Sequence, residues 1–251
     1  GLGDVYKRQD QRRGRIIYEP NLEYTKAMNY QIDAPGSAIR TPVKLPASKS
    51  ISNRALILNA LSYSAYDVEN LSDCDDTNLM VKALNSNDRD FNVGAAGTTM
   101  RFLTAFLSKV VGEWTITGTE RMKNRPIKVL VDALNALGAR IEYMEKEGYP
   151  PLRIFGSALQ GGEISLPGNV SSQYISAILM IAPLTENGVT LHLEGAIISR
   201  PYIHITLQLM EQYGVRASWT ENTIKVLPQE YKPIRFTVES DWSAASYWYE
   251  I

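Results

Sequence analysis

This chain of 251 residues has little of what marks secreted, metal-binding or membrane proteins. Cys74 is its single cysteine, which excludes an internal disulfide. Its two histidines, His192 and His204, form no ligand group with Cys74 at zinc-site spacing, so we expect no metal. No apolar run approaches the roughly 18 residues of a membrane span. The sequence therefore predicts a cytoplasmic protein.

An excess of either charge is also absent. The formal net charge is −1, and Lys and Arg are interspersed with Asp and Glu instead of forming a stripe. This pattern argues against nucleic acid or a membrane surface as a partner. With 44% hydrophobic residues, the chain can build a sizeable core in one or two domains.

The acidic run at 73–77 allows two interpretations. It has the oxygen ligands of a divalent-cation site, and it also stands immediately before an amphipathic helix predicted over 78–84. Carboxylates at a helix start cap free N–H groups and offset the helix dipole. We favour this second interpretation.

The most informative segment is 45–56. A proline turn leads into a predicted helix whose first turns carry two cations and three hydroxyl groups, on Lys49, Arg54, Ser48, Ser50 and Ser52. The N–H groups of a helix start attract anions, which cations and hydroxyl groups also hold. Taken alone, the segment fits an anion site and a serine-capped helix with solvated cations equally well.

The same pattern of an extended run, a small-residue turn and a helix returns at 92–103 and 164–182. Pro46 and Pro167 stand at equivalent points, which indicates an internal repeat. The helix of the third copy is predicted over 175–182, from its apolar residues.

A second recurring unit is a helix that ends at a turn and continues as a strand. It occurs at 131–143 and 207–219, with Gly138 and Gly214 where a helix C-cap needs a positive φ. A degenerate third copy is predicted at 79–91. The chain is therefore predicted to contain three α/β units in series, which can aim several helix starts at a common point.

Residues 1–27 do not share this pattern. They contain a basic cluster at 12–15 without an apolar period. We expect neither a signal peptide nor a packed element there, and we predict that the natural chain begins at Met28.

From Met28 onward, several motifs follow one another in a specific order. They are Leu45-Pro46-x-Ser48-Lys49-Ser50-x-Ser52-Asn53-Arg54, Gly94-x-x-Gly97-Thr98-x-x-Arg101, Arg121-Met122-Lys123-Asn124-Arg125-Pro126-Ile127, Ser171-Ser172-Gln173, Ser199-Arg200-Pro201-Tyr202 and Asp241-Trp242-Ser243-Ala244-Ala245-Ser246-Tyr247. In this order they resemble the 5-enolpyruvylshikimate-3-phosphate synthase family.

The resemblance implies an α/β (α+β) fold of two similar domains. Each is an inside-out barrel of three βαβαββ units, with helix N-termini facing the cleft between the domains. It also implies a transferase of the shikimate pathway, in aromatic amino-acid and chorismate biosynthesis. The enzyme would move the enolpyruvyl group of phosphoenolpyruvate to the 5-hydroxyl of shikimate 3-phosphate and release phosphate. No metal or organic cofactor is implied, and we expect a monomer.

The same resemblance divides the chain into parts. Residues 1–27 would be a non-native or disordered extension, 28–44 the first strand of one domain, 45–233 the complete second domain and 234–251 the return to the first, truncated domain. The chain would stop before later glutamate, arginine and lysine motifs that close over phosphoenolpyruvate. We expect this fragment alone to be inactive.

Residue roles follow from the matching motif positions. By resemblance, Lys49 contacts both substrates and takes part in proton transfer, while Asp241 binds the shikimate hydroxyls and is the candidate base. The other residues predicted to bind shikimate 3-phosphate are Ser50, Arg54, Ser171, Ser172, Gln173, Ser199 and Tyr202. The residues predicted to bind phosphoenolpyruvate are Lys49, Gly97, Arg125 and Gln173.

The chemistry is consistent with these roles, because both substrates are phosphorylated carboxylates that need cations and helix starts. The rigid guanidinium of Arg125 suits a clamp, and Gly97 permits close backbone approach. Simpler alternatives exist, in which Arg125 decorates a helix start and Ser171 and Ser172 are ordinary caps.

Two residues depart from the family pattern. Ala95 and Phe102 stand where relatives often have asparagine and proline, so the resemblance does not carry sensitivity to glyphosate over to this chain. The competing enzyme is the UDP-N-acetylglucosamine enolpyruvyl transferase, which has asparagine at the position of Ser50 and a loop cysteine that Cys74 is badly placed to replace. A third hypothesis is a non-catalytic module that only binds shikimate 3-phosphate.

Overall fold

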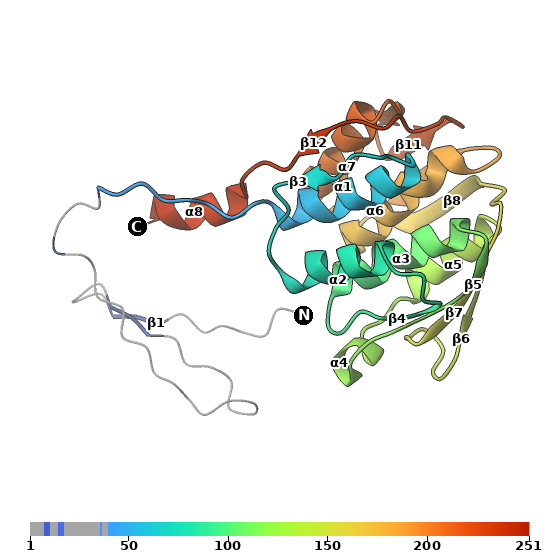
Figure 1. Ribbon diagram of the computed structural model, residues 1–251, viewed down its shortest axis with the longest axis horizontal. Coiled ribbons are helices and arrows are strands. Elements are labelled where there is room, and N and C mark those ends of the chain that lie inside the picture. The colour runs from blue at the N-terminus through green and yellow to red at the C-terminus, as the bar shows by residue number, and fades with distance from the viewer. Residues whose placement is uncertain (1–7, 11–14, 18–35, 37–39, 251) are drawn as a thin grey trace. The chain divides into compact units, whose positions relative to one another are not determined.

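The computed structural model describes residues 8–10, 15–17, 36 and 40–250, and the chain divides into two units, Gly1–Lys44 and Leu45–Ile251 (Figure 1). In the first unit, β1 (Arg8–Asp10) pairs antiparallel with β2 (Arg15–Ile17). The sequence predicts no element there, because a hairpin of such short strands carries no apolar period. Most of the strand predicted at 28–44 lies outside the described residues, and 40–44 form no strand.

The second unit contains two complete βαβαββ repeats. One comprises β4 (Asp90–Asn92), α3 (Gly97–Lys109), β5 (Gly112–Thr117), α4 (Glu120–Lys123), α5 (Lys128–Ala136), β6 (Arg140–Tyr143) and β7 (Leu152–Gly156). The other comprises β8 (Gly162–Pro167), α6 (Ser172–Ile181), the 3-10 helix η1 (Ala182–Leu184), β9 (Val189–Glu194), α7 (Arg200–Gln212), β10 (Ala217–Thr220) and β11 (Thr223–Val226). Their sheets have equivalent orders, β4-β5-β7-β6 and β8-β9-β11-β10, with the first two strands parallel.

The first repeat lacks a closing hairpin and takes its first strand from the far end of the unit. It comprises α1 (Lys49–Leu61), β3 (Val68–Glu69) and α2 (Asp75–Leu84). β12 (Phe236–Thr237) lies parallel to β3, in the place that β4 takes beside β5. An antiparallel bridge joins Ala47 to Ser240. The segment 234–240 therefore closes the ring of three repeats before α8 (Trp242–Glu250) begins.

The helix-turn-strand copy predicted at 79–91 does consist of a helix and a strand, but its strand belongs to the next repeat. α2 and β4 are both present, but β4 pairs with β5 and opens the second repeat. A sequence period shows that a strand exists, whereas its partner is decided across the sheet. Both α2 and α6 also begin three residues before their predicted starts at 78 and 175, since polar cap residues carry no apolar signal.

Two predicted helix ends are confirmed. α5 and α7 are each followed by a C-cap residue and then by glycine in the left-handed region, with φ of 99° at Gly138 and 87° at Gly214. The strands β6 and β10 start shortly afterwards.

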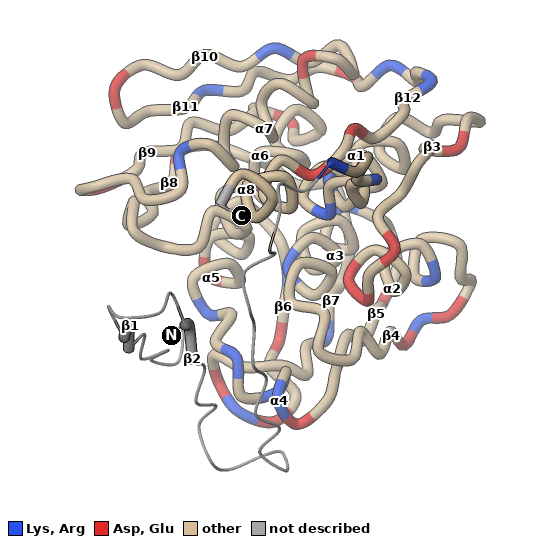
Figure 2. Tube along the Cα trace, turned by 90° about the vertical axis from the view of Figure 1, so that its left-hand side faces the viewer, with Lys and Arg blue, Asp and Glu red and all other residues tan. Residues whose placement is uncertain are grey.

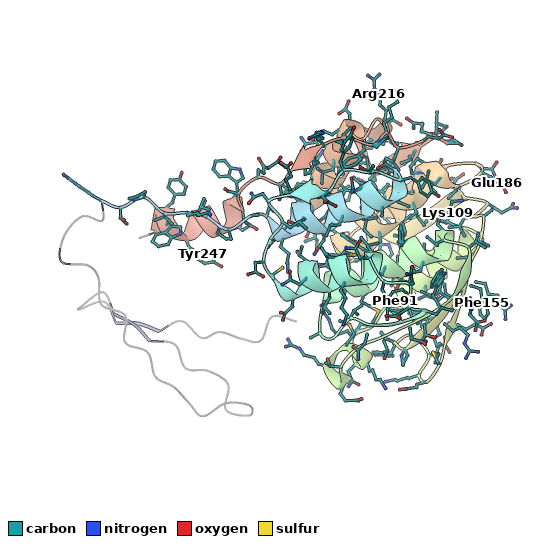
Figure 3. All side chains as sticks on the ribbon, in the orientation of Figure 1. Phe91, Lys109, Phe155, Glu186, Arg216 and Tyr247 are labelled. Carbon is teal, nitrogen blue, oxygen red and sulfur yellow. The ribbon has the colours of Figure 1, made fainter. Side chains whose placement is uncertain are left out.

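Helices occupy the middle of the second unit and strands lie around them (Figure 2). α1, α3 and α6 pack on one another, and in α6 every residue except Gln173 is buried. Each of the outer helices α2, α5 and α7 buries one face, which in α2 consists of Thr77 and Met80. This difference explains why the α6 segment is almost continuously apolar. Outside the core, Figure 3 shows the side chain of Tyr247 projecting from α8. Tyr247 is 74% exposed.

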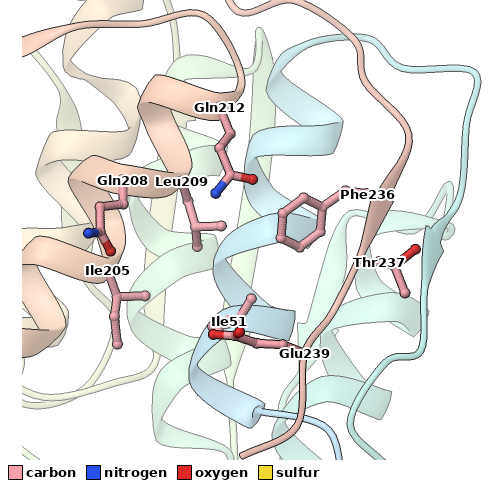
Figure 4. Close-up of a pocket in the computed structure, with 8 residues that line it drawn as sticks. All are labelled: Ile51, Ile205, Gln208, Leu209, Gln212, Phe236, Thr237 and Glu239. Carbon is pink, nitrogen blue, oxygen red and sulfur yellow. The ribbon is translucent and has the colours of Figure 1, made fainter.

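Three grooves lie at equivalent places, each between an outer helix and the first strand of the next repeat. They lie between α7 and β12, α2 and β4, and α5 and β8, with volumes of about 260, 160 and 410 Å³. Figure 4 shows the first groove, lined by Ile51, Leu209 and Phe236 among others. Because the repeat architecture alone produces all three, we assign the grooves to the fold and not to a ligand. No helix among the described residues is long and apolar enough to cross a membrane.

Candidate anion-binding site

Asp76 joins the start of α1 to the start of α3. Its Oδ2 lies 3.7 Å from Lys49 Nζ. Its Oδ1 accepts a 2.8 Å hydrogen bond from the backbone N–H of Thr98, in the first turn of α3. Asp76 therefore caps a helix other than its own, while Cys74, the N-cap of α2, makes no side-chain cap bond. The capping interpretation of 73–77 is incomplete, and the sequence does not single out Asp76 because its partners are distant in the chain.

Gln173 joins α3 to α6. Its Oε1 accepts a 2.8 Å hydrogen bond from Arg101 Nη1, and its Nε2 donates a 3.1 Å bond to Thr98 Oγ1. The next residue, Tyr174, donates from its hydroxyl to the carbonyl of Pro126, at 2.6 Å. The starts of α3 and α6 and the segment before α5 are thus fixed together.

Arg101 and Arg125 meet at Gly97, the first residue of α3. A Cβ on Gly97 would lie 2.7 Å from both Arg101 Nη1 and Arg125 Nη2, which is too close for any real side chain. Glycine is therefore needed for both guanidinium groups to reach the helix start. Burial lowers the pKa of Arg125, and the positive charge of Arg101 lowers it further.

Arg54 is buried, with 2% of its surface exposed. Its guanidinium donates to Thr206 Oγ1 at 2.7 Å, to Ser50 O at 2.8 Å and to Ser176 Oγ at 2.9 Å. The ring of Phe102 lies 5.4 Å from the guanidinium carbon. Burial lowers the pKa of Arg54 to about 10.

Arg54 has a structural role that its motif does not reveal. Its bonds join α1 to α6 and α7 and use three of the five N–H donors of a guanidinium. Contact with shikimate 3-phosphate remains a prediction and would have to use the other donors. Phe102, which stands where relatives often have proline, is fully buried with its ring against the guanidinium of Arg54. This departure from the family pattern therefore changes the surroundings of Arg54.

The predicted serines and tyrosine stand at helix starts. Ser171 is the N-cap of α6 and accepts a 3.4 Å bond from the N–H of Gln173. Ser172 follows it and is buried. Ser199 is the N-cap of α7, in the left-handed region at φ 61°, and its side chain makes no cap bond. Tyr202, 40% exposed in the first turn of α7, is near enough to Arg54 to oppose the effect of burial on its pKa.

A backbone hydrogen bond holds Asp241 beside the start of α1. Its N–H donates to the carbonyl of Pro46 at 2.8 Å, and the neighbouring N–H of Ser48 donates to Glu239. Its Oδ1 accepts from the N–H groups of Ser243 and Ala244, at 2.7 and 3.2 Å, as the cap of α8. One carboxylate oxygen is therefore engaged in capping.

The cluster carries much more positive than negative charge. Its cations are Lys49, Arg54, Arg101, Arg121 and Arg125, and Asp76 is the acid paired within it. Helix starts and guanidinium groups both favour phosphate and carboxylate groups. Within the described part of the chain, no three His, Cys, Asp or Glu side chains gather as a metal site. The arrangement is suited to a small, highly charged anion.

The comparisons with known proteins agree with this geometry. The family model described as EPSP synthase (3-phosphoshikimate 1-carboxyvinyltransferase) matches residues 34–87 and 84–250. The 3-phosphoshikimate 1-carboxyvinyltransferase of Bacteroides fragilis (strain YCH46) is 60% identical over 225 residues, 89% of this chain and 55% of the relative. That of Vibrio campbellii is 43% identical over 242 residues, 85% of this chain and 57% of the relative.

A solved structure adds evidence on the fold. EPSP synthase from Acinetobacter baumannii superposes with a TM-score of 0.73 at 21% identity, covering 82% of this chain and 51% of that chain. The chain therefore spans about half the length of the relatives it matches. The two segments of the family match meet at the end of α2, where the first repeat lacks its hairpin. Family match, repeat fold and ordered motifs together show that this chain belongs to the EPSP synthase family.

Proposed function

We propose that this chain supplies one half of the active site of a 3-phosphoshikimate 1-carboxyvinyltransferase, which transfers the enolpyruvyl group of phosphoenolpyruvate to the 5-hydroxyl of shikimate 3-phosphate. The observation that carries the proposal is the gathering of cations at two helix starts: Arg101 and Arg125 meet at Gly97 in α3, and Asp76 links Lys49 of α1 to the same turn. The 60% identity to a relative of that name supports it.

The proposed roles follow from exposure and charge. Lys49 has a side chain 47% exposed and a carboxylate 3.7 Å away, so its ammonium group can approach an anion and move a proton. Arg125 would clamp phosphoenolpyruvate, since its guanidinium is only partly buried beside Gly97. Asp241 would accept the proton of the attacking hydroxyl through the oxygen that does not cap α8.

The remaining roles concern shikimate 3-phosphate. Ser50, Arg54, Ser171, Ser172, Gln173, Ser199 and Tyr202 would surround it, and their positions at the starts of α1, α6 and α7 support this assignment. We also propose a monomer in the cytoplasm. The domain that begins at 45 would extend past 233 to about 240, because β12 completes its smallest sheet.

A binding experiment tests the anion site. Calorimetric titration of the chain with each substrate is expected to show that Arg125→Ala weakens phosphoenolpyruvate more than shikimate 3-phosphate. Lys109→Met, at the far end of α3, is a control that should change neither. Equal losses from Arg125→Ala would show that the clamp is misassigned.

A chimera tests catalysis. This chain would replace the matching part of the Bacteroides fragilis relative, which covers 55% of that protein. We expect phosphate release from the two substrates, and Lys49→Met should abolish it while the fold persists. Turnover with UDP-N-acetylglucosamine in place of shikimate 3-phosphate would contradict the proposal.

A further inference from the structure

Arg101 is a buried cation that the proposed substrate contacts do not use. It lies one turn after Gly97 in α3, is 9% exposed, and pairs with no carboxylate among the residues that the structure describes. Its Nε is buried without a hydrogen-bond partner in that part of the chain. Burial of an unpaired charge is costly. A cation in this position therefore requires an explanation.

The hydrogen bonds of Arg101 supply one. A single nitrogen, Nη1, donates to Gly97 O at 3.0 Å and to Gln173 Oε1 at 2.8 Å. The guanidinium also lies over the ring of Tyr174, with its carbon 5.2 Å from the centroid. Arg101 is thus held by both α3 and α6, at the point where the two helices start.

The hydrogen bond from Arg101 determines which way the side-chain amide of Gln173 is turned. A glutamine amide is nearly symmetric in shape, but its oxygen only accepts hydrogen bonds and its nitrogen only donates them. Arginine has no acceptor, so Arg101 selects the orientation in which the oxygen of Gln173 faces it. Nε2 then points to Thr98 Oγ1 and keeps a second N–H. In this orientation the amide nitrogen, and not the oxygen, is available to an anion.

We propose that Arg101 is a positioning residue, which fixes Gln173 as a hydrogen-bond donor to the ligand and does not touch the ligand itself. The inference rests on the proposed function, and it takes from the family resemblance that Gln173 binds phosphoenolpyruvate as well as shikimate 3-phosphate. The guanidinium of Arg125 also reaches Gly97, and Arg125 is more exposed to solvent than Arg101. Arg125 would contact the anion directly, whereas Arg101 would influence the anion only through Gln173.

A double-mutant cycle tests this role. The variants Arg101→Met, Gln173→Leu and their combination are titrated with phosphoenolpyruvate, with shikimate 3-phosphate present. Each single change is expected to weaken binding about tenfold, and the pair no more than either alone, because both remove the same donor. Additive losses would overturn the inference, since Arg101 would then act on the ligand independently of Gln173.

The matched control is Arg140→Met. Arg140 also lies over an aromatic ring, that of Phe155 at 4.0 Å, but on the outer strand β6. We expect wild-type affinity from it. If the wild-type chain binds neither substrate and the chimera described above releases no phosphate, the proposed function fails. If the chain binds both substrates and the cycle is additive, only the role of Arg101 fails.

A spectroscopic measurement keeps the inference testable if a variant is unstable. In wild-type chain, the two nuclear magnetic resonance signals of the Nε2 protons of Gln173 should be sharp and should exchange slowly with solvent, because the amide is bonded on both sides. Arg101→Met should move and broaden them while leaving the side-chain signals of Gln229, bonded to Arg216 O and Leu227 O, unchanged. Unaltered Gln173 signals would overturn the inference.

Discussion

A buried arginine destabilises a fold unless other groups satisfy its charge or its hydrogen-bond donors. Arg54 and Arg101 both meet neutral acceptors, while the acid nearest the cluster, Asp76, pairs with the more exposed Lys49. The positive charges of Arg54 and Arg101 are therefore not balanced by a carboxylate where an anion would bind. This balance makes two single substitutions informative.

Asp76→Asn should raise the affinity of the site for inorganic phosphate several-fold. The substitution removes the negative charge near Lys49 and keeps an oxygen that can accept from the N–H of Thr98. Equilibrium titration at low and high salt measures the effect, which should shrink at high ionic strength. Asp73→Asn is the control, because Asp73 is exposed and accepts a hydrogen bond from Asn78 instead of pairing with Lys49. Unchanged affinity for Asp76→Asn would show that its charge does not act on the site.

Gly97→Ala should leave the fold intact and weaken phosphoenolpyruvate binding about tenfold or more. The three atoms nearest to the new methyl group are guanidinium nitrogens of Arg101 and Arg125, so we expect these side-chain ends to move and the backbone to stay in place. Thermal unfolding and calorimetric titration separate the two effects. Gly36→Ala, where the added carbon meets nothing within 4 Å among the described residues, is the control. A large loss of stability would contradict this account.

At the scale of elements, α1, α3 and α6 are the buried helices, and their starts carry the site. Arg54 holds α1 against α6 and α7 through Ser176 and Thr206, which also bond to each other at 2.8 Å. Because these contacts are fully buried, the spacing of the helix starts depends on them. Helix packing and the geometry of the site are therefore coupled.

Thr206→Val should lower the free energy of unfolding by about 2–3 kcal/mol, because it leaves the buried Nε of Arg54 without its acceptor. The shape of the side chain is preserved. Denaturant unfolding gives the value. The comparison is Thr104→Val, at an equally buried threonine that donates only to Met100 O, where about 1 kcal/mol is expected. Equal losses at both positions would show that the charge of Arg54 is not involved.

At the scale of the whole molecule, the ring of repeats is closed by two distant parts of the chain. β12 pairs with β3, and Val238, 1% exposed, accepts a 2.6 Å bond from Asn70 Nδ2. The first repeat otherwise has only one strand of its own in this sheet. A groove of about 390 Å³ lies beside Val68, lined by residues of α1 and α2.

Ending the chain after Pro233 should therefore lower the free energy of unfolding by about 2–5 kcal/mol, through exposure of the core beside β3. A chain ending after Ser246 is the control, since it removes only the last five residues, among which Tyr247 and Tyr249 are exposed. Circular dichroism during denaturation compares the two. Similar stability for both would show that β12 is dispensable.

Local features were predictable from the sequence because each depends on neighbouring residues. The glycines after α5 and α7 occupy the predicted left-handed positions, and the motif at 45–56 does form a helix capped by Ser48. The family itself was recognisable from the order of its motifs and is confirmed. Two helix starts were misplaced by three residues, since their polar first turns lack an apolar period.

The repeats, several helix caps and the family could be predicted because they are recorded in short-range patterns of residue type. The cap that Asp76 places on α3, the hydrogen bond between Arg101 and Gln173, and the pairing of β12 with β3 became visible only in the folded chain. Each of these contacts joins residues at least 22 positions apart. Their partners are chosen by packing in three dimensions, which no local pattern of apolar and polar residues specifies.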